Sequence, residues 1–136
     1  MAYKRPRRSK YKLRVKRSSA GLGLFAGESI KRGDFVIEYF GPMLTDDEAD
    51  AKGGKYLFTI GKNKTINGTS RENIARYINH SCKPNCEVEI DGERLFVYAK
   101  RAIKEGEELN YNYGEEYFDE FIKPHGCRCG NHTRGT

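Results

Sequence analysis

Two short polar segments contain residue types that often do chemistry. The first is Asn79-His80-Ser81-Cys82, and Pro84-Asn85-Cys86 follows one residue later. A histidine close to a cysteine could activate a thiol nucleophile or bind a metal ion. The alternative is a hydrogen-bonded turn in which the asparagine side chains bond their own backbone. Residues adjacent in sequence seldom bring an imidazole onto the neighbouring sulfur, so the pattern argues against a cysteine protease.

The second segment is Tyr111-Asn112-Tyr113-Gly114. Side chains on a strand alternate between its two faces, so Tyr111 and Tyr113 share one face and the asparagines take the other. Aromatic residues on one strand face usually belong to a core, but a buried phenol needs a hydrogen-bond partner. The segment therefore predicts a slot lined by two tyrosines and polar at one end.

A glycine pair, Gly21-x-Gly23, precedes both segments. Because glycine has no Cβ, backbone amides at such a site can approach a ligand closely. The pair lacks the third glycine, the β-α-β context and the downstream acid of a dinucleotide-binding fingerprint. An ordinary turn is the alternative interpretation.

Four cysteines occur as a C-x3-C pair, Cys82 and Cys86, and a C-x-C pair, Cys127 and Cys129. No export signal accompanies them, so reduced thiols or a metal site are favoured over disulfides. A C-x-C pair can give two thiolates to a tetrahedral zinc ion only if further ligands come from elsewhere.

The charge of the chain is divided unevenly. Residues 1–17 contain nine Lys or Arg and no acid, although the net charge of all 136 residues is only +6. We expect a flexible basic arm over residues 1–11 and nonspecific contact with DNA through residues 4–17. A solubilising extension is the alternative. The chain has neither a membrane-length apolar run nor a secretion signal, so we expect an intracellular protein without a membrane partner. We expect it in the nucleus if it is eukaryotic or acts on a eukaryotic host, and otherwise in the cytoplasm.

The pattern of apolar residues predicts a single domain that is mainly β with a few short helices. Thr45 and Glu48 form a capping box that opens a helix over residues 46–52. Asp91-Gly92 predicts a hairpin between residues 86–90 and 94–99. Other strands are expected near residues 13–16, 21–26, 35–39, 56–60, 64–66 and 107–113, and other short helices over 71–78 and 115–122.

Taken in order, four segments resemble the motifs of the SET-domain family of protein lysine methyltransferases. The matching segments are residues 21–26, 38–41, 76–86 and 106–114. The resemblance covers residues 12 to 130. It implies a catalytic domain over residues 12–122 and a partial post-SET segment over residues 123–136.

The resemblance implies small β-sheets, with the C-terminal segment threaded through a preceding loop as a pseudoknot. It also implies S-adenosylmethionine and a peptide bound on opposite faces and joined by a narrow channel. Tyr113 aligns with the catalytic tyrosine. Tyr111 aligns with a channel position that influences how many methyl groups are added, and Tyr39 is expected in the same channel. The expected cofactor-binding residues are Ala20, Gly21, Leu22, Gly23, Tyr56, Arg76, Asn79 and His80.

The family's C-terminal zinc site is only partly matched. Cys82, Cys127 and Cys129 correspond to three zinc ligands, but Arg134 stands at the position of the fourth. His132 as a nitrogen ligand and a segment without zinc are both open alternatives. Asn112 also stands where the family commonly has aspartate, which removes one acid beside the channel.

These motifs predict methyl transfer from S-adenosylmethionine to a lysine side chain of a histone or other DNA-associated protein. Acidic residues 46–50 and 115–120 could steer a basic substrate tail to the domain, or could form an ordinary solvated surface. Two alternatives remain: a catalytically silent SET-like module that binds basic peptides, and a small zinc-dependent nucleic-acid binder. The second leaves three of the four motifs unused.

Overall fold

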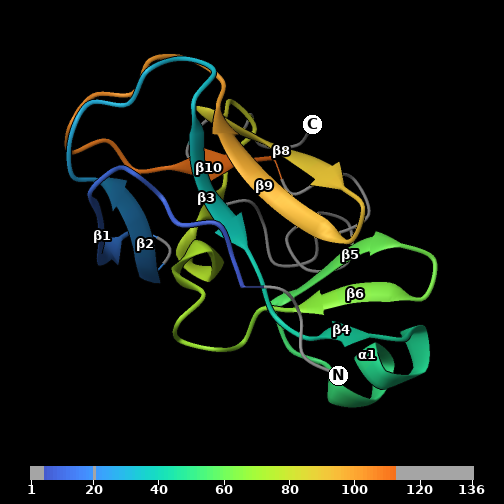
Figure 1. Ribbon diagram of the computed structural model, residues 1–136. Helices are drawn as coiled ribbons and strands as arrows, with labels where there is room; N and C mark the ends of the chain where they lie inside the picture. Colours follow the sequence, from blue (N-terminus) through green and yellow to red (C-terminus); the bar gives the residue numbers. More distant parts are fainter. Residues whose placement is uncertain (1–4, 20, 113–136) are drawn as a thin grey trace.

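The computed structural model describes residues 5–19 and 21–112, which form four small β-sheets with one short α-helix (Figure 1). The central sheet has the strand order β3-β9-β8. Figure 1 shows the β1–β2 hairpin on one side of it and the sheet β4-β6-β5, with the helix α1, on the other. This architecture confirms the predicted mainly β fold.

The strands β1 (Leu13–Ser18) and β2 (Gly21–Ala26) pair in antiparallel register. The free edge of β2 is covered by residues 107–109. Ala26 N donates to Glu107 O at 2.9 Å, and Leu109 N donates to Leu24 O at 2.8 Å. The glycine-rich strand is therefore held on both edges, once by its own hairpin and once by a segment more than eighty residues away.

The central sheet consists of β3 (Phe35–Tyr39), β9 (Arg94–Ala99) and β8 (Cys86–Asp91). Asp91 pairs with Arg94, which confirms the predicted hairpin and leaves Gly92-Glu93 as its two-residue loop. Gly92 has a positive φ of 65°, as tight hairpin turns require. Every residue of β3 is buried, so this strand forms the middle of the core.

The third sheet contains β4 (Met43–Leu44), β6 (Lys64–Asn67) and β5 (Leu57–Gly61). The helix α1 (Asp46–Lys52) follows β4 and begins as predicted. Thr45 accepts a hydrogen bond from Glu48 N, and the Glu48 side chain accepts one from Thr45 N. The bond from Thr45 N to the Glu48 carboxylate is the main cause that lowers the pKa of Glu48, and the Thr45 side chain lowers it further.

The fourth sheet pairs two very short strands that are distant in sequence. The strand β7 (Asn79–His80) runs parallel to β10 (Asn110–Tyr111), with Asn79 opposite Asn110 and His80 opposite Tyr111. Parallel pairing across the intervening β8–β9 hairpin joins the two polar segments found in the sequence. The predicted threading of the chain after residue 112 lies outside the described residues and stays a prediction.

Two predicted elements are shorter in the structure. The helix expected over residues 71–78 is only the 3₁₀ turn η1 (Ile74–Tyr77), because Asn73 uses its side chain elsewhere. Its amide donates to Gly68 O at 3.1 Å and accepts from Phe40 N at 3.1 Å. The strand expected over residues 107–113 is regular only at 110–111, although residues 107–109 also bond to the edge of β2. The predicted helix over 115–122 lies outside the described residues.

The core joins the sheets and η1, whereas α1 contributes no buried residue. Its most deeply buried side chains include Leu24, Val36, Leu95, Ile103 and Leu109. Ile30 and Ile103 form an isolated antiparallel bridge between the segments that follow β2 and β9. Within residues 5–19 and 21–112, no helix has the length and apolar character needed to cross a bilayer.

The described part of the basic arm lies against the domain. Arg7 N donates to Glu38 Oε1 at 2.7 Å, and Arg94 donates to both Glu38 oxygens and to Arg5 O. The Arg7 guanidinium stacks 4.0 Å from the centre of the Phe35 ring. The buried Glu38 carboxylate thus fastens residues 5–7, which the sequence alone assigned to a flexible arm. The domain boundary at residue 11 stays a prediction.

Candidate functional site

The glycine pair and the first polar segment meet at one place. Asn79 Nδ2 lies 3.1 Å from Ser18 Oγ, 3.1 Å from Leu22 O and 2.8 Å from Glu108 Oε2. We call Ser18, Gly21, Leu22, Gly23, Asn79 and Glu108 the polar cluster. Its members come from β1, β2, β7 and the segment before β10, so tertiary pairing brings them together.

The two glycines of the cluster have different surroundings. Gly21 has a φ of 107°, and no atom of residues 5–19 or 21–112 lies within 4 Å of where a Cβ would be. Leu22 beside it is 49% exposed. Gly23 is buried, and a Cβ there would lie 2.4 Å from Glu108 Oε2. Open backbone that a ligand could approach is therefore found at residues 21–22, whereas the space beside Gly23 is filled by a carboxylate.

Arg76 forms a second group with two tyrosines. Its guanidinium lies 4.5 Å from the Tyr56 ring centre and 4.7 Å from that of Tyr77. Its Nη2 donates to the Tyr77 hydroxyl at 2.8 Å, and its Nη1 donates to Thr69 O. Its Nε is buried and has no hydrogen-bond partner in the described part of the chain. A buried unpaired donor is costly, so a ligand acceptor at this position would be stabilised.

These two groups are linked by the chain itself. Arg76 lies in η1, Asn79 begins β7 two residues after η1 ends, and η1 packs against β2. The structure thus places Gly21, Leu22, Gly23, Tyr56, Arg76, Asn79 and His80 on neighbouring elements. Ala20 lies outside the described residues.

The aromatic side of the site is built from three rings, which we call the aromatic cluster: Tyr39, Phe58 and Tyr111. Phe58 lies 5.5 Å from Tyr39 and 6.1 Å from Tyr111 between ring centres. Tyr39 and Tyr111 are 4% and 3% exposed. The two tyrosines expected in one channel therefore share one neighbour. Tyr113 lies outside the described residues.

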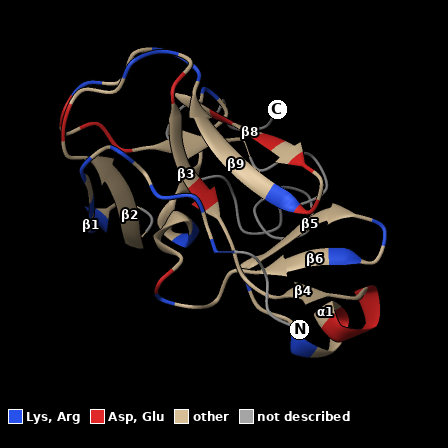
Figure 2. Ribbon diagram, viewed as in Figure 1, with Lys and Arg blue, Asp and Glu red and all other residues tan. Residues whose placement is uncertain are grey.

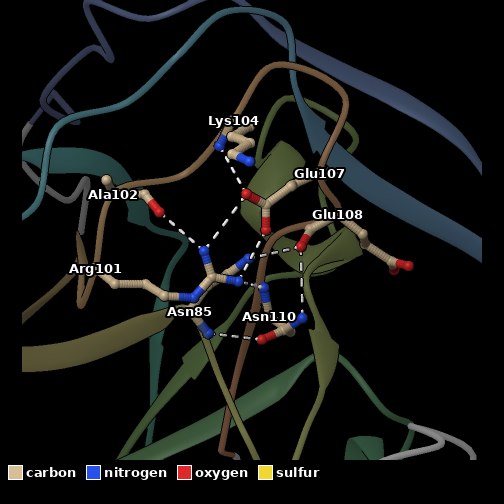
Figure 3. Close-up of polar contacts among 7 residues, drawn as sticks. All are labelled: Asn85, Arg101, Ala102, Lys104, Glu107, Glu108 and Asn110. Atoms are coloured by element: carbon tan, nitrogen blue, oxygen red, sulfur yellow. Dashed lines mark hydrogen bonds and ion pairs between the residues drawn. The ribbon is translucent and has the colours of Figure 1, made fainter.

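The strand that carries Tyr111 is fixed by a reciprocal asparagine pair. Asn85 N donates to Asn110 Oδ1 at 2.8 Å, and Asn110 N donates to Asn85 Oδ1 at 3.0 Å (Figure 3). Asn85 Nδ2 also donates to Glu108 O at 2.9 Å. Side-chain amides here replace the backbone bonds that a longer strand would provide, so β10 stays in register despite its two-residue length.

The two described cysteines, Cys82 and Cys86, do not belong to a completed metal site among the described residues. Cys82 Sγ lies 3.4 Å from His80 Nε2, and Cys86 is buried at the start of β8. Burial raises the pKa of Cys86 to about 12, so this thiol stays protonated. Residues 5–19 and 21–112 contain no group of three His, Cys, Asp or Glu side chains arranged around a metal. Cys127, Cys129 and His132 lie outside the described residues, so zinc stays a prediction.

Several residues near the site were not singled out from the sequence. Phe58 follows Tyr56 at strand spacing, which was a usable signal for a shared face. Ser18, Glu108 and Asn110 carried no such signal, because their partners are distant in sequence. A cavity of about 430 Å³ lies between residues 6–13 and β3, and it shares no lining residue with the polar or aromatic cluster.

Opposite charges gather on different parts of the molecule. Figure 2 shows acidic residues on α1 and β8, and basic residues along the segment that leads into β1. Arg8, Lys12, Arg14, Lys16 and Arg17 are exposed. Lys10 pairs with Asp34 at 3.3 Å, and the Tyr11 hydroxyl bonds the same carboxylate and lowers its pKa. The N-terminal segment is therefore fixed by a few contacts while most of its cations face solvent.

Comparison with known proteins agrees with this arrangement. The family model for the SET domain matches residues 21–114. The chain is 38% identical to histone-lysine N-methyltransferase ASHR3 of Arabidopsis thaliana over 141 residues, covering 93% of this chain and 28% of that protein. It is 41% identical to an H3 lysine-4 specific histone-lysine N-methyltransferase of Schizosaccharomyces pombe over 125 residues, covering 82% of this chain and 13% of that protein.

The match spans both segments of the site, from the glycine pair to the end of the second polar segment. The chain therefore belongs to the SET-domain family. It spans only 28% and 13% of the lengths of these two relatives, so it corresponds to one part of each.

Proposed function

We propose that this chain transfers a methyl group from S-adenosylmethionine to a lysine side chain of a histone or another DNA-associated protein. One observation carries the proposal. The parallel β7–β10 pair places Asn79 of the polar cluster and Tyr111 of the aromatic cluster on adjacent strands. A ligand bound at the polar cluster could thus react with a substrate side chain that enters beside the aromatic cluster. The relatives' names, histone-lysine N-methyltransferases, support the substrate class.

The residues present fit the proposed cofactor. The backbone at Gly21 and Leu22 is exposed beside the Asn79 amide. The buried Arg76 Nε needs an acceptor, which the cofactor's carboxylate would provide, and Tyr56 offers an aromatic face. We assign cofactor binding to Ala20, Gly21, Leu22, Gly23, Tyr56, Arg76, Asn79 and His80. When bound, the cofactor would supply an electrophilic methyl group on a positively charged sulfur.

The aromatic cluster would prepare the lysine. Lysine must lose a proton before its nitrogen can attack, and deprotonating a free lysine at pH 7 costs about 4.6 kcal/mol. An amine bound beside the buried Tyr39 and Tyr111 would be partly desolvated, which disfavours its charged form and would lower this cost. The neutral amine would then be able to accept the methyl group that the bound cofactor would supply.

Tyr113 and Tyr111 would orient the reacting groups. A phenol with a pKa near 10 is a poor general base at neutral pH, so we assign Tyr113 orientation and electrostatic stabilisation. A Tyr111 hydroxyl bonded to the amine would restrict its rotation and occupy space that added methyl groups need. We therefore propose mono- or dimethylation, and replacing Tyr111 by Phe should increase the degree of methylation seen by mass spectrometry.

Labelled S-adenosylmethionine incubated with histones tests the reaction. We expect label on histone lysines with the wild-type protein, and a loss of at least about a hundredfold with Tyr113→Phe. Calorimetry with S-adenosylhomocysteine tests the binding step separately. A wild-type protein that binds no S-adenosylhomocysteine would contradict the proposal, and one that binds it but never methylates would favour a silent peptide-binding module.

The exposed cations of residues 8–17 support contact with the DNA that accompanies such a substrate. Substituting Arg14, Lys16 and Arg17 by glutamine should reduce activity on nucleosomes but not on a free histone peptide. All three side chains are exposed, so the fold should persist. Equal activity of this variant and the wild type on nucleosomes would contradict the DNA contact. Metal analysis of the purified chain tests the predicted zinc at Cys82, Cys127 and Cys129.

A further inference from the structure

Glu108 has a rigid backbone and a side chain aimed at the polar cluster. Its backbone forms a bridge with Phe25 of β2, and the next residue, Leu109, is fully buried. Figure 3 shows its carboxylate pointing away from that of its neighbour Glu107, which faces Arg101 and Lys104. The two adjacent carboxylates therefore bond to different partners, Glu107 to Arg101 and Lys104 and Glu108 to Asn79.

The Glu108 carboxylate is the closest of the acceptors that orient the Asn79 amide. An ionised carboxylate only accepts hydrogen bonds, whereas a side-chain amide has a donating nitrogen and an accepting oxygen. The 2.8 Å contact therefore selects the orientation in which Nδ2 faces Glu108 and Oδ1 faces away. Leu22 O at 3.1 Å is also an obligate acceptor and favours the same orientation, whereas the Ser18 hydroxyl favours neither because it can donate to an amide oxygen as well as accept from an amide nitrogen.

Gly23 leaves the room that this carboxylate occupies. A Cβ on Gly23 would lie 2.4 Å from Glu108 Oε2, 3.0 Å from its Cδ and 3.1 Å from Ser18 Cβ. Gly23 is not among the glycines with positive φ, so its backbone tolerates other residues. The absence of a side chain is thus explained by the carboxylate rather than by backbone strain.

We propose that Glu108 is a positioning residue that orients the Asn79 amide toward the methyl donor, and that Gly23 is glycine in order to admit the Glu108 carboxylate. This inference rests on the proposed function, because it assumes that Asn79 contacts the cofactor. It assigns different roles to the two glycines: Gly21 leaves backbone open for a ligand, and Gly23 makes room for the Glu108 side chain.

Calorimetry with S-adenosylhomocysteine tests the proposal on the full chain. Glu108→Gln keeps the size of the side chain but removes its charge and its obligate acceptor character. We expect about tenfold weaker binding, the usual effect of losing a hydrogen bond to a charged group. The KM for S-adenosylmethionine should rise while the KM for a histone peptide stays unchanged. Glu107→Gln is the matched control and should bind S-adenosylhomocysteine like the wild type.

A double-mutant cycle shows whether Glu108 acts through Asn79. Adding Glu108→Gln to Asn79→Ala should weaken binding no further, because the amide to be oriented is already gone. Gly23→Ala should mimic Glu108→Gln, since the new methyl group displaces the flexible end of the carboxylate. If Glu108→Gln fails to fold, Gly23→Ala still tests whether the position of the Glu108 carboxylate affects cofactor binding.

The outcomes separate this inference from the proposed function. A wild-type protein that binds no S-adenosylhomocysteine overturns both. A wild type that binds it, together with a Glu108→Gln variant of equal affinity, overturns only the positioning role. Additive effects of Glu108→Gln and Asn79→Ala would likewise show that Glu108 does not act through Asn79.

Discussion

The polar cluster and the aromatic cluster are adjacent through the β7–β10 pair, but they are built in opposite ways. The polar cluster is held by side-chain hydrogen bonds to Asn79, and the space left by Gly23 is filled by the tip of the Glu108 side chain. The aromatic cluster is held by packed rings and by backbone segments in close contact. A Cβ on Gly68 would lie 2.5 Å from the Tyr39 ring, and one on Gly41 would lie 1.8 Å from Asn67 O.

This difference has a physical consequence. A carboxylate can rotate away from an intruding methyl group, whereas a backbone carbonyl or a buried ring moves only when the surrounding core moves. Changes to the polar cluster should therefore alter ligand binding at a small cost in stability. Changes to the aromatic cluster should alter stability first.

The largest effect is expected from Tyr111→Ala. Removing a buried aromatic ring at the junction of β10 and Phe58 should lower the free energy of unfolding by about 3–5 kcal/mol, measured by urea denaturation. Tyr111→Phe keeps the ring and should cost about 1 kcal/mol. Equal losses for both variants would show that the hydroxyl, and not ring packing, holds this position.

Gly41→Ala should come next, with a loss of about 2–3 kcal/mol, because its Cβ would press on a backbone carbonyl of β6. Gly61→Ala is the matched control. The nearest atom to its Cβ, Lys64 Cδ, is 4.0 Å away, so stability should change by about 0.5 kcal/mol or less. If both variants were equally stable, the close contact between Gly41, which follows β3, and Asn67 of β6 would not limit the stability of the fold.

Asn79→Ala should lower the unfolding free energy by about 1–3 kcal/mol, because the Glu108 carboxylate loses its amide donor. Its main effect should be on ligands, with at least about tenfold weaker binding of S-adenosylhomocysteine in calorimetry. An affinity equal to that of the wild type would show that the Asn79 side chain does not contribute to cofactor binding.

The smallest effect is expected from Glu107→Gln, at the edge of the polar cluster. The hydrogen bond from Arg101 lowers the pKa of Glu107 in the folded state, so its stabilising effect is present above its unfolded pKa and is lost as pH falls through its folded pKa. The pair is partly exposed, so the variant should lose about 1 kcal/mol or less at pH 7. In urea titrations at successively lower pH, the wild type and variant should become equally stable.

Local sequence predicted those elements whose determinants are close together. The capping box of Thr45 and Glu48 and the Asp91-Gly92 hairpin both appear as expected, since their bonds join residues a few positions apart. The helix predicted over residues 71–78 is only a 3₁₀ turn over Ile74–Tyr77, for the opposite reason. The Asn73 side chain accepts a hydrogen bond from Phe40 N, which is 33 residues away in the chain. A local sequence pattern does not predict such a distant partner.

By itself, the sequence determined the family, the mainly β fold and which segments carry the site, because motif spacing and period-two alternation are local properties. Only the tertiary structure decided how these segments meet. It placed the Asn79 amide against Glu108, gave Gly21 and Gly23 different surroundings, and fastened residues 5–7 to the buried Glu38. Each of these contacts joins residues far apart in the chain, and they meet only once the sheets have paired around a common core.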